Sequence, residues 1–188
     1  MAKKRILLLS SGSGSIAEAI FSAVDSGELD LEIVALISDR DSQSLVRAKS
    51  HQVDSHYLPV GSDRQEWNQR LLNLVIDHEP DLVVSVGFMR ILEPDFVRRF
   101  KVLNTHPALL PAFPGAHAVR DALAAGVSIT GTTVHWVDEG VDTGPIIEQV
   151  EVPVLPGDSQ SELHERIKIQ ERILIVETLK KLTNSGEQ

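Results

Sequence analysis

The sequence predicts an α/β fold: a single domain with a mostly parallel, twisted sheet and helices on both faces. Short apolar runs alternate with segments of helical periodicity, a rhythm that favours parallel strands joined by helices. The 188 residues suit one domain and contain no internal repeat, low-complexity tract or linker. With 42% hydrophobic and 24% charged residues, the composition is that of a globular protein.

Four strands are predicted in the first half of the chain, each from a short apolar run of the kind that parallel sheets bury. These runs cover residues 5–9, 32–38, 56–59 and 82–86. Helical periodicity predicts helices at residues 16–27, 44–51 and 63–79. The last of these helices has the clearest signals, because Asp63 can cap its start, Trp67 opens an apolar stripe and Pro80 stops it.

The second half of the chain continues the alternation. Strands are predicted at residues 102–106, 129–137 and 146–152, and helices at residues 93–100, 118–125 and 159 to about 182. Ser159 and Glu162 have the spacing of a capping box at the start of the last helix. Residues 107–115 contain three prolines and cannot be regular structure, and the polar tail 183–188 is expected to fray.

Charge and composition exclude several classes of function. The formal charge of −9 repels polyphosphate backbones, so no nucleic-acid partner is expected. The absence of cysteine excludes a thiolate nucleophile, a cysteine-based zinc site and a disulfide scaffold. The apolar run after the basic N-terminus is too short for a signal peptide, and no stretch is long enough to span a membrane. We therefore expect a cytoplasmic protein with no membrane partner.

A Gly-rich turn between the first strand and the first helix is a candidate phosphate site. The run Gly12-Ser13-Gly14-Ser15 places free N–H groups and the positive end of a helix dipole beside any bound anion. The run extended to Ala17 also fits a dinucleotide fingerprint, with Asp39 at the end of the second strand as the ribose contact. The alternative is that Gly and Ser simply form a good turn.

Asn104 and His106 form the most informative pair in the sequence. Residues two apart on a strand point to the same side, so both project together at the carboxyl edge of the sheet, where ligands bind in such folds. An amide donor beside an imidazole suits acyl transfer, because one holds an oxyanion and the other moves a proton. Asp142, in a loop after a later strand, can pair with His106. The alternatives are a strand-end His that bonds a loop carbonyl and an ordinary turn Asp.

A metal site is a second interpretation of the same region. His106, His135 and Asp142 could supply two imidazoles and a carboxylate. This interpretation depends on whether the strand of His135 neighbours the strand of His106, which the sequence leaves open.

Four segments resemble the folate-dependent formyltransferases over nearly the whole chain. They are 87–92 (GFMRIL), 103–111 (LNTHPALLP), 131–135 (GTTVH) and 138–146 (DEGVDTGPI). The resemblance implies a Rossmann-like formyltransferase fold and transfer of a formyl group from 10-formyltetrahydrofolate to an amine. The implied acceptor is glycinamide ribonucleotide, a phosphorylated ribosyl amine of de novo purine biosynthesis. The amine is the nucleophile, so the reaction needs no metal.

The resemblance also implies roles for individual residues. Asn104 would bind the formyl oxygen, a cationic His106 would stabilise the oxyanion and donate a proton, and Asp142 would keep that imidazole charged. The implied folate-binding residues are Arg64, Met89, Arg90, Ile91, Leu92, Asn104, Asp138, Glu139, Gly140 and Val141. The implied ribonucleotide-binding residues are Gly12, Ser13, Gly14, Ser15, Ile16 and Glu171. Phosphate binding would thus fall in about residues 1–100, and catalysis and folate binding in about residues 101–182.

The chain departs from the family pattern at two positions that concern the acceptor. Ile16 replaces an expected Asn and is expected to turn toward the core or the pocket wall, and Ala108 replaces a usual Ser. Another small amine or a sugar nucleotide therefore stays an alternative acceptor, and a nucleotide-binding oxidoreductase module is the alternative from a different class. We expect neither the RNA-binding domain of tRNA formyltransferases nor the regulatory domain of formyltetrahydrofolate deformylase, and either a monomer or a homodimer.

Overall fold

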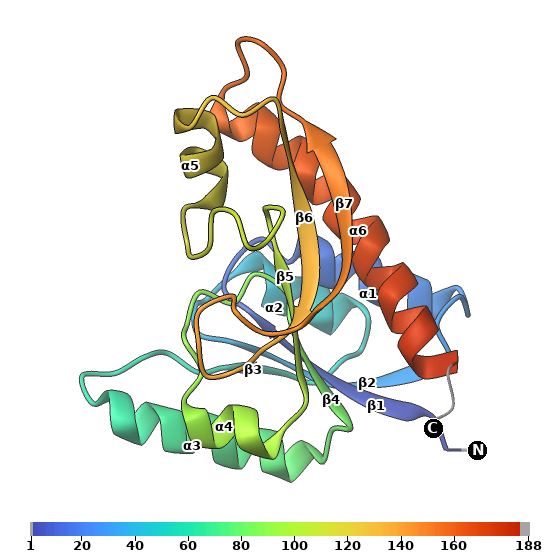
Figure 1. Ribbon diagram of the computed structural model, residues 1–188. Coiled ribbons are helices and arrows are strands. Elements are labelled where there is room, and N and C mark those ends of the chain that lie inside the picture. Colours follow the sequence, from blue (N-terminus) through green and yellow to red (C-terminus); the bar gives the residue numbers. More distant parts are fainter. Residues whose placement is uncertain (1, 185–188) are drawn as a thin grey trace.

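The seven apolar runs form one sheet in the computed structural model, which describes residues 2–184 (Figure 1). The strands are β1 (Lys4–Ser10), β2 (Leu31–Ser38), β3 (Ser55–Tyr57), β4 (Leu82–Ser85), β5 (Val102–His106), β6 (Ile129–Trp136) and β7 (Ile146–Pro153). Their order across the sheet is β3-β2-β1-β4-β5-β6-β7. The first five strands in this order are parallel, whereas β6 runs antiparallel to β5 and β7 runs antiparallel to β6. The predicted fold class is confirmed.

Helices cover both faces of this sheet. They are α1 (Ser15–Asp25), α2 (Gln43–Ser50), α3 (Arg64–His78), α4 (Pro94–Arg99), α5 (Ala118–Ala124) and α6 (Gln160–Asn184). Side chains of α1, α2 and α6 pack into one apolar core with alternate residues of the strands, and those of α3 and α4 pack into a second core with the others. In Figure 1, α3 and α4 lie below the sheet and α6 runs along β6 and β7.

Helix starts follow the capping signals of the sequence. Asp63 accepts hydrogen bonds from the backbone N–H groups of Gln65 and Glu66 at 2.8 and 3.0 Å, and so satisfies two free donors at the start of α3. Ser159 and Glu162 form the predicted capping box before α6, through reciprocal bonds of 2.9 and 3.2 Å. α6 continues to Asn184, so the predicted fraying of the tail is wrong for residues 183–184, and residues 185–188 lie outside the described part.

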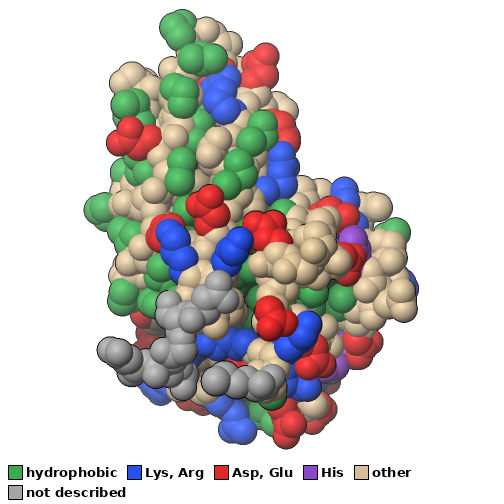
Figure 2. Space-filling model, turned by 90° about the vertical axis from the view of Figure 1, so that its right-hand side faces the viewer, with side chains coloured by type: hydrophobic (Ala, Val, Ile, Leu, Met, Phe, Trp, Pro, Cys, Tyr) green, Lys and Arg blue, Asp and Glu red, His purple; other side chains and the backbone are tan. Residues whose placement is uncertain are grey.

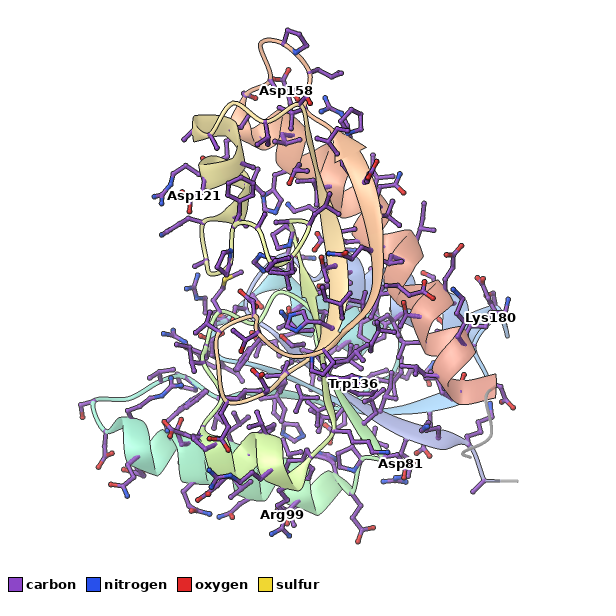
Figure 3. The ribbon with its side chains drawn as sticks, viewed as in Figure 1. Asp81, Arg99, Asp121, Trp136, Asp158 and Lys180 are labelled. Atoms are coloured by element: carbon purple, nitrogen blue, oxygen red, sulfur yellow. The ribbon has the colours of Figure 1, made fainter. Side chains whose placement is uncertain are left out.

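The surface mixes charges of both signs with apolar side chains. Figure 2 shows the face that carries β7 and α6. Lys181 of α6 forms an ion pair with Glu148 of β7, and Arg172 forms one with Glu165 within α6. In the loop before α6, Asp158 (Figure 3) accepts two hydrogen bonds from the guanidinium of Arg166, at 2.7 and 2.8 Å. Within residues 2–184, no helix combines the length and the apolar character that a membrane span requires.

The parallel strands bring three loops to one edge of the sheet. β1 pairs with β4 and β4 with β5, so their carboxyl ends are neighbours. The Gly-rich turn follows β1, Gly87 follows β4, and His106 is the last residue of β5. Backbone contact joins the first two loops, because the N–H of Ser11 donates to the carbonyl of Gly87 at 3.1 Å. This edge is where ligands bind in open α/β sheets.

Candidate active site

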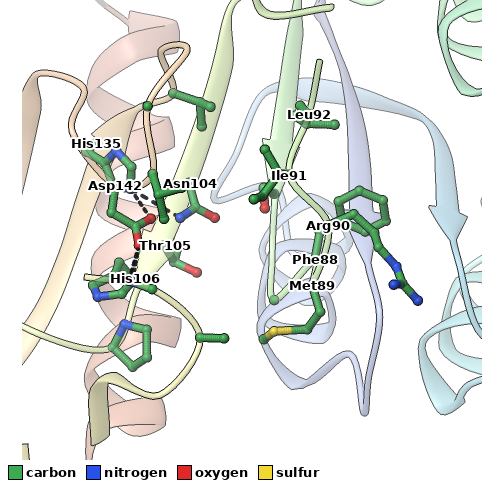
Figure 4. Close-up of a pocket in the computed structure, with 18 of the residues that line it drawn as sticks. Phe88, Met89, Arg90, Ile91, Leu92, Asn104, Thr105, His106, His135 and Asp142 are labelled. Carbon is green, nitrogen blue, oxygen red and sulfur yellow. Dashed lines mark hydrogen bonds and ion pairs between the residues drawn. The ribbon is translucent and has the colours of Figure 1, made fainter. Parts of the chain in front are cut away.

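A pocket of about 370 Å³ opens at this edge, between the loop after β4, the end of β5 and the loop after β6. Asn104, His106 and Asp142 all line it, so the structure brings together the three predicted catalytic residues (Figure 4). The opposite wall is formed by residues 87–92. Asn104 and His106 therefore share one cavity with Asp142, a loop residue that lies 36 or more positions later in the chain.

The carboxylate of Asp142 lies between two imidazoles. Oδ2 is 3.3 Å from Nδ1 of His106, and Oδ1 is 3.5 Å from Nε2 of His135. The backbone N–H of Gly115 donates to Oδ2 at 2.7 Å. Burial by itself raises the pKa of Asp142, but the hydrogen bonds from His135 and Gly115 and the charge of His106 outweigh it and lower the pKa. Asp142 is therefore held as a carboxylate.

Both ring nitrogens of His106 face hydrogen-bond acceptors. Nε2 lies 2.8 Å from the carbonyl oxygen of Phe113, and Nδ1 faces Asp142. Burial is the largest influence on the pKa of His106 and lowers it, although Asp142 and the Phe113 carbonyl oppose that effect. This direction differs from the expectation that Asp142 keeps the imidazole cationic. Without a bound ligand, the lowered pKa favours the neutral imidazole of His106. When the ring is protonated, each of its two N–H groups has an acceptor.

His135 is a part of the site that the sequence did not assign to catalysis. The register of β5 and β6 places it directly opposite Asn104, and its side chain is 2% exposed. Nδ1 lies 2.9 Å from the carbonyl oxygen of Trp136 and must carry a hydrogen, since a carbonyl only accepts. Nε2 lies 3.2 Å from Nδ2 of Asn104 and 3.5 Å from Oδ1 of Asp142, so it accepts from Asn104 in the neutral ring and donates to Asp142 in the protonated ring. In its neutral form, His135 orients the Asn104 amide and leaves the second amide hydrogen for a ligand.

The loop after β4 is held by charged partners outside the pocket. Nε of Arg90 donates to Oδ2 of Asp39 at 2.6 Å, and Nη2 of Arg64 donates to the carbonyl of Ile91 at 2.8 Å. The backbone N–H of Met89 donates to Oγ of Ser11 at 2.8 Å. Asp39 is therefore buried against Arg90, which argues against its suggested role as a ribose contact of a dinucleotide.

Most of the predicted folate-binding residues lie at this pocket, and two do not. The residues that line it are Met89, Arg90, Ile91, Leu92, Asn104, Asp138, Gly140 and Val141. Arg64 lies outside the lining and donates a hydrogen bond to the carbonyl of Ile91 in the loop. Glu139 turns away, because its carboxylate accepts from Nε of Arg98 at 2.7 Å on the surface. A direct ligand contact of Glu139 in this conformation is therefore not supported.

The predicted ribonucleotide residues lie outside the pocket lining. Gly14 caps α1 in a left-handed conformation with φ of 72°. Gly12 and Ser13 are exposed, as a phosphate site requires. Ile16 is buried in the core beneath the helix, as the sequence predicts. Glu171 is buried on α6, and burial raises its pKa to about 7.

The metal interpretation of His106, His135 and Asp142 gains no support from the geometry. The two imidazoles contact different oxygens of the Asp142 carboxylate, so their nitrogens do not converge on one point. Among residues 2–184, the ligand atoms that do converge within 4.8 Å belong to Asp54, His56 and His78, in another part of the molecule.

Comparison with known proteins identifies the family of the chain. The family described as formyl transferase matches residues 4–179. Phosphoribosylglycinamide formyltransferase of Mycobacterium tuberculosis strain H37Rv is 47% identical over 189 residues, with 98% of this chain and 87% of that protein covered. The protein of that name from Escherichia coli K12 is 37% identical over 174 residues, with 90% and 82% covered.

A solved structure gives the same result. Glycinamide ribonucleotide transformylase 1 from Symbiobacterium toebii superposes with a TM-score of 0.93 at 37% identity, and the match covers 97% of this chain and 88% of that one. The resemblance indicated by the sequence motifs is thus confirmed, and the chain belongs to the formyl transferase family.

Proposed function

We propose that the chain transfers a formyl group from 10-formyltetrahydrofolate to the amine of glycinamide ribonucleotide, as a cytoplasmic step of purine biosynthesis. The observation that carries this proposal is the grouping of Asn104, His106 and Asp142 at one pocket, in a chain that is 47% identical to a phosphoribosylglycinamide formyltransferase. The acceptor is inferred from the relatives, and the chemistry from the pocket.

The three side chains have complementary tasks in this reaction. The folate derivative supplies the formyl group, and transfer forms a C–N bond to the amine, breaks the N10–formyl bond and moves one amine proton to N10. Nδ2 of Asn104 donates a hydrogen bond to the formyl oxygen as negative charge develops on it. Nε2 of His106 can donate to the same oxygen or carry the moving proton once it leaves the carbonyl of Phe113, and Asp142 at Nδ1 orients the ring and stabilises it when charged.

The apolar side chains that line the pocket suit a reduced folate. Met89, Ile91 and Val141 are among the large hydrophobic side chains that remain exposed, and all three line the pocket. Apolar side chains around an open cavity favour a flat heterocycle, while the backbone of the same loops offers polar groups to its edge. Arg64 and Arg90 place positive charge at the loop after β4, where an anionic tail would be attracted.

The Gly-rich turn suits the phosphate of the acceptor. Gly12 has no positive φ, and a Cβ built there meets no atom within 4 Å. The fold therefore does not require glycine at this position, whereas close approach of a ligand to the backbone would. The exposed N–H groups here precede α1, whose dipole adds a favourable field for an anion.

A substrate panel tests the proposal. Purified protein is assayed for release of tetrahydrofolate from 10-formyltetrahydrofolate with glycinamide ribonucleotide, with sugar-nucleotide amines and with unphosphorylated glycinamide. We expect turnover with glycinamide ribonucleotide and little with the others. Strong turnover with a different phosphorylated amine would keep the formyl transfer and overturn the acceptor. Binding of a reduced nicotinamide cofactor in place of folate would overturn the whole proposal.

A further inference from the structure

A cluster of three possible metal ligands lies at the opposite edge of the sheet from β7. Asp54 immediately precedes the edge strand β3, His56 lies within β3, and His78 is the last residue of α3. Four strand-to-strand steps separate β3 from the catalytic strand β5. With neighbouring strands about 4.8 Å apart, β3 is roughly 19 Å from β5 across the sheet, and none of the three residues lines the pocket described above.

The distances among the three donor atoms match a bound metal ion. Nε2 of His56 lies 2.9 Å from Nε2 of His78 and 3.1 Å from Oδ2 of Asp54, and Nε2 of His78 lies 3.9 Å from that same oxygen. The circumradius of a triangle with these sides is about 2.0 Å, so one point lies about 2.0 Å from all three atoms. Zinc binds imidazole nitrogen at roughly 2.0–2.1 Å and carboxylate oxygen at roughly 2.0–2.2 Å.

Hydrogen bonding alone leaves this cluster incompletely satisfied. Two Nε2 atoms and a carboxylate oxygen face one another, and for neutral rings a hydrogen on one Nε2 serves at most one strong bond among the three. The two rings meet at 58° with centroids 5.0 Å apart, so they approach through their nitrogen-bearing edges and do not stack. A divalent cation would satisfy all three atoms at once.

Two imidazole nitrogens and one carboxylate oxygen form a donor set that zinc accepts. A facial set for octahedral iron needs three sides of about 3.0 Å, and a tetrahedral zinc needs sides of about 3.3 Å. The three sides average about 3.3 Å, so zinc binding requires the 3.9 Å side to shorten and the 2.9 Å side to widen. Arg5 adds an opposing positive charge, because it donates to the carbonyl of His78 at 2.8 Å, so we expect moderate affinity.

We propose that Asp54, His56 and His78 form a zinc site that joins β3 to the end of α3, with water completing the coordination. The site joins an edge strand of three residues to a helix 22 positions further along the chain. A metal ion that binds the folded state and not the unfolded state raises the stability of the fold by mass action. The site is a structural brace, remote from the proposed catalysis, so turnover should not depend on it.

Zinc titration of the EDTA-treated full chain tests this proposal. We expect one Zn²⁺ per chain, bound more weakly than zinc in closed structural sites, and a rise in Tm on binding. His56→Gln and His78→Gln should each weaken binding by at least about tenfold, since each removes one of three ligands. His164→Gln, on the half-buried part of α6, is the matched control and should bind zinc as the wild type does.

A third variant, a spectroscopic probe and turnover measurements complete the test of the zinc site. Asp54→Asn alters an exposed side chain and should also weaken binding, so a folding defect of His78→Gln would not stop the experiment. Co²⁺ as a spectroscopic probe should give visible absorption that His56→Gln abolishes. Binding weaker than about 1 mM, or binding that survives both histidine substitutions and disappears in His106→Ala, overturns the proposal. Turnover of the wild type should be equal with zinc and after chelation, and a loss on chelation would overturn the assignment as a brace.

Discussion

Nδ1 of His106 lies 3.3 Å from Oδ2 of Asp142, while the other nitrogen of the same ring lies 2.8 Å from the carbonyl of Phe113. Two acceptors on one buried ring hold its orientation whether or not it is protonated, because at least one N–H always has a partner. The same carboxylate accepts from the N–H of Gly115, so the proline-rich loop and the loop after β6 are fixed to each other through Asp142. The position of the imidazole is therefore set before any ligand binds.

Removal of any member of this group should reduce catalysis while the fold survives. Asn104→Ala removes a proposed oxyanion donor, and loss of one such donor lowers kcat by roughly 10²–10³. We expect His106→Ala and Asp142→Asn to lower kcat at least as far, because each affects both the donor and the proton. Steady-state kinetics with circular dichroism as the folding check measures this. Asp41→Asn, at an exposed position, serves as the control. Near-native turnover of His106→Ala would refute the proposed mechanism.

A substitution in the Gly-rich turn should weaken substrate binding without changing the stability of the fold. Gly12→Ala adds a methyl group that meets nothing within 4 Å, so the Tm should stay unchanged. The methyl group would occupy the space through which a phosphate approaches the N–H groups, so KM for the ribonucleotide should rise by about tenfold or more with little change in kcat. Gly61→Ala is the matched control, since its Cβ is equally unhindered and lies in a different loop. Equal KM values in all three proteins would place the phosphate elsewhere.

The ion pair of Asp39 with Arg90 leads to a prediction about the folate. Asp39→Asn removes the charge that holds Nε of Arg90 at 2.6 Å, and so loosens the wall formed by residues 89–92. We expect KM for 10-formyltetrahydrofolate to rise by roughly tenfold and kcat to change little. This is the result expected when a contact stabilises the bound substrate and the transition state equally. Asp41→Asn, two residues away and exposed, is the control. A fall in kcat with KM unaltered would contradict this positioning role.

The sequence was sufficient to predict that Asn104 and His106 lie together, because one local rule governs both positions. Strand alternation puts residues two apart on the same side, and the carboxyl ends of parallel strands share one edge. His135 was not predictable in the same way. Its place opposite Asn104 depends on the antiparallel pairing of β6 with β5, which no local pattern specifies. For the same reason, the sequence left open whether the two histidines were neighbours.

Asp39 illustrates a second limit of local patterns. An acidic residue after the second strand fits a ribose contact, yet here it pairs with Arg90, 51 positions further along the chain. The Gly-rich run remained compatible with a dinucleotide until that partner was known. Cap and periodicity signals, in contrast, act within one or two turns, which explains why the cap at Asp63 and the capping box of Ser159 with Glu162 were predicted correctly.

The buried carboxyl of Glu171 makes stability depend on pH in a predictable direction. Burial raises its pKa from 4.5 to about 7, so between these values the folded chain keeps a proton that the unfolded chain has lost. Its contribution is therefore fully present below pH 4.5 and is lost as the pH rises through about 7. The loss is about 3 kcal/mol, because a tenfold change in a proton-binding constant corresponds to about 1.4 kcal/mol. Glu171→Gln should match the wild type near pH 4 and exceed it by about 3 kcal/mol near pH 8.5 in urea unfolding. Glu177→Gln, at an exposed position of α6, should differ little from the wild type at either pH. An equal change for Glu171→Gln at both pH values would show that charge burial is not the cause.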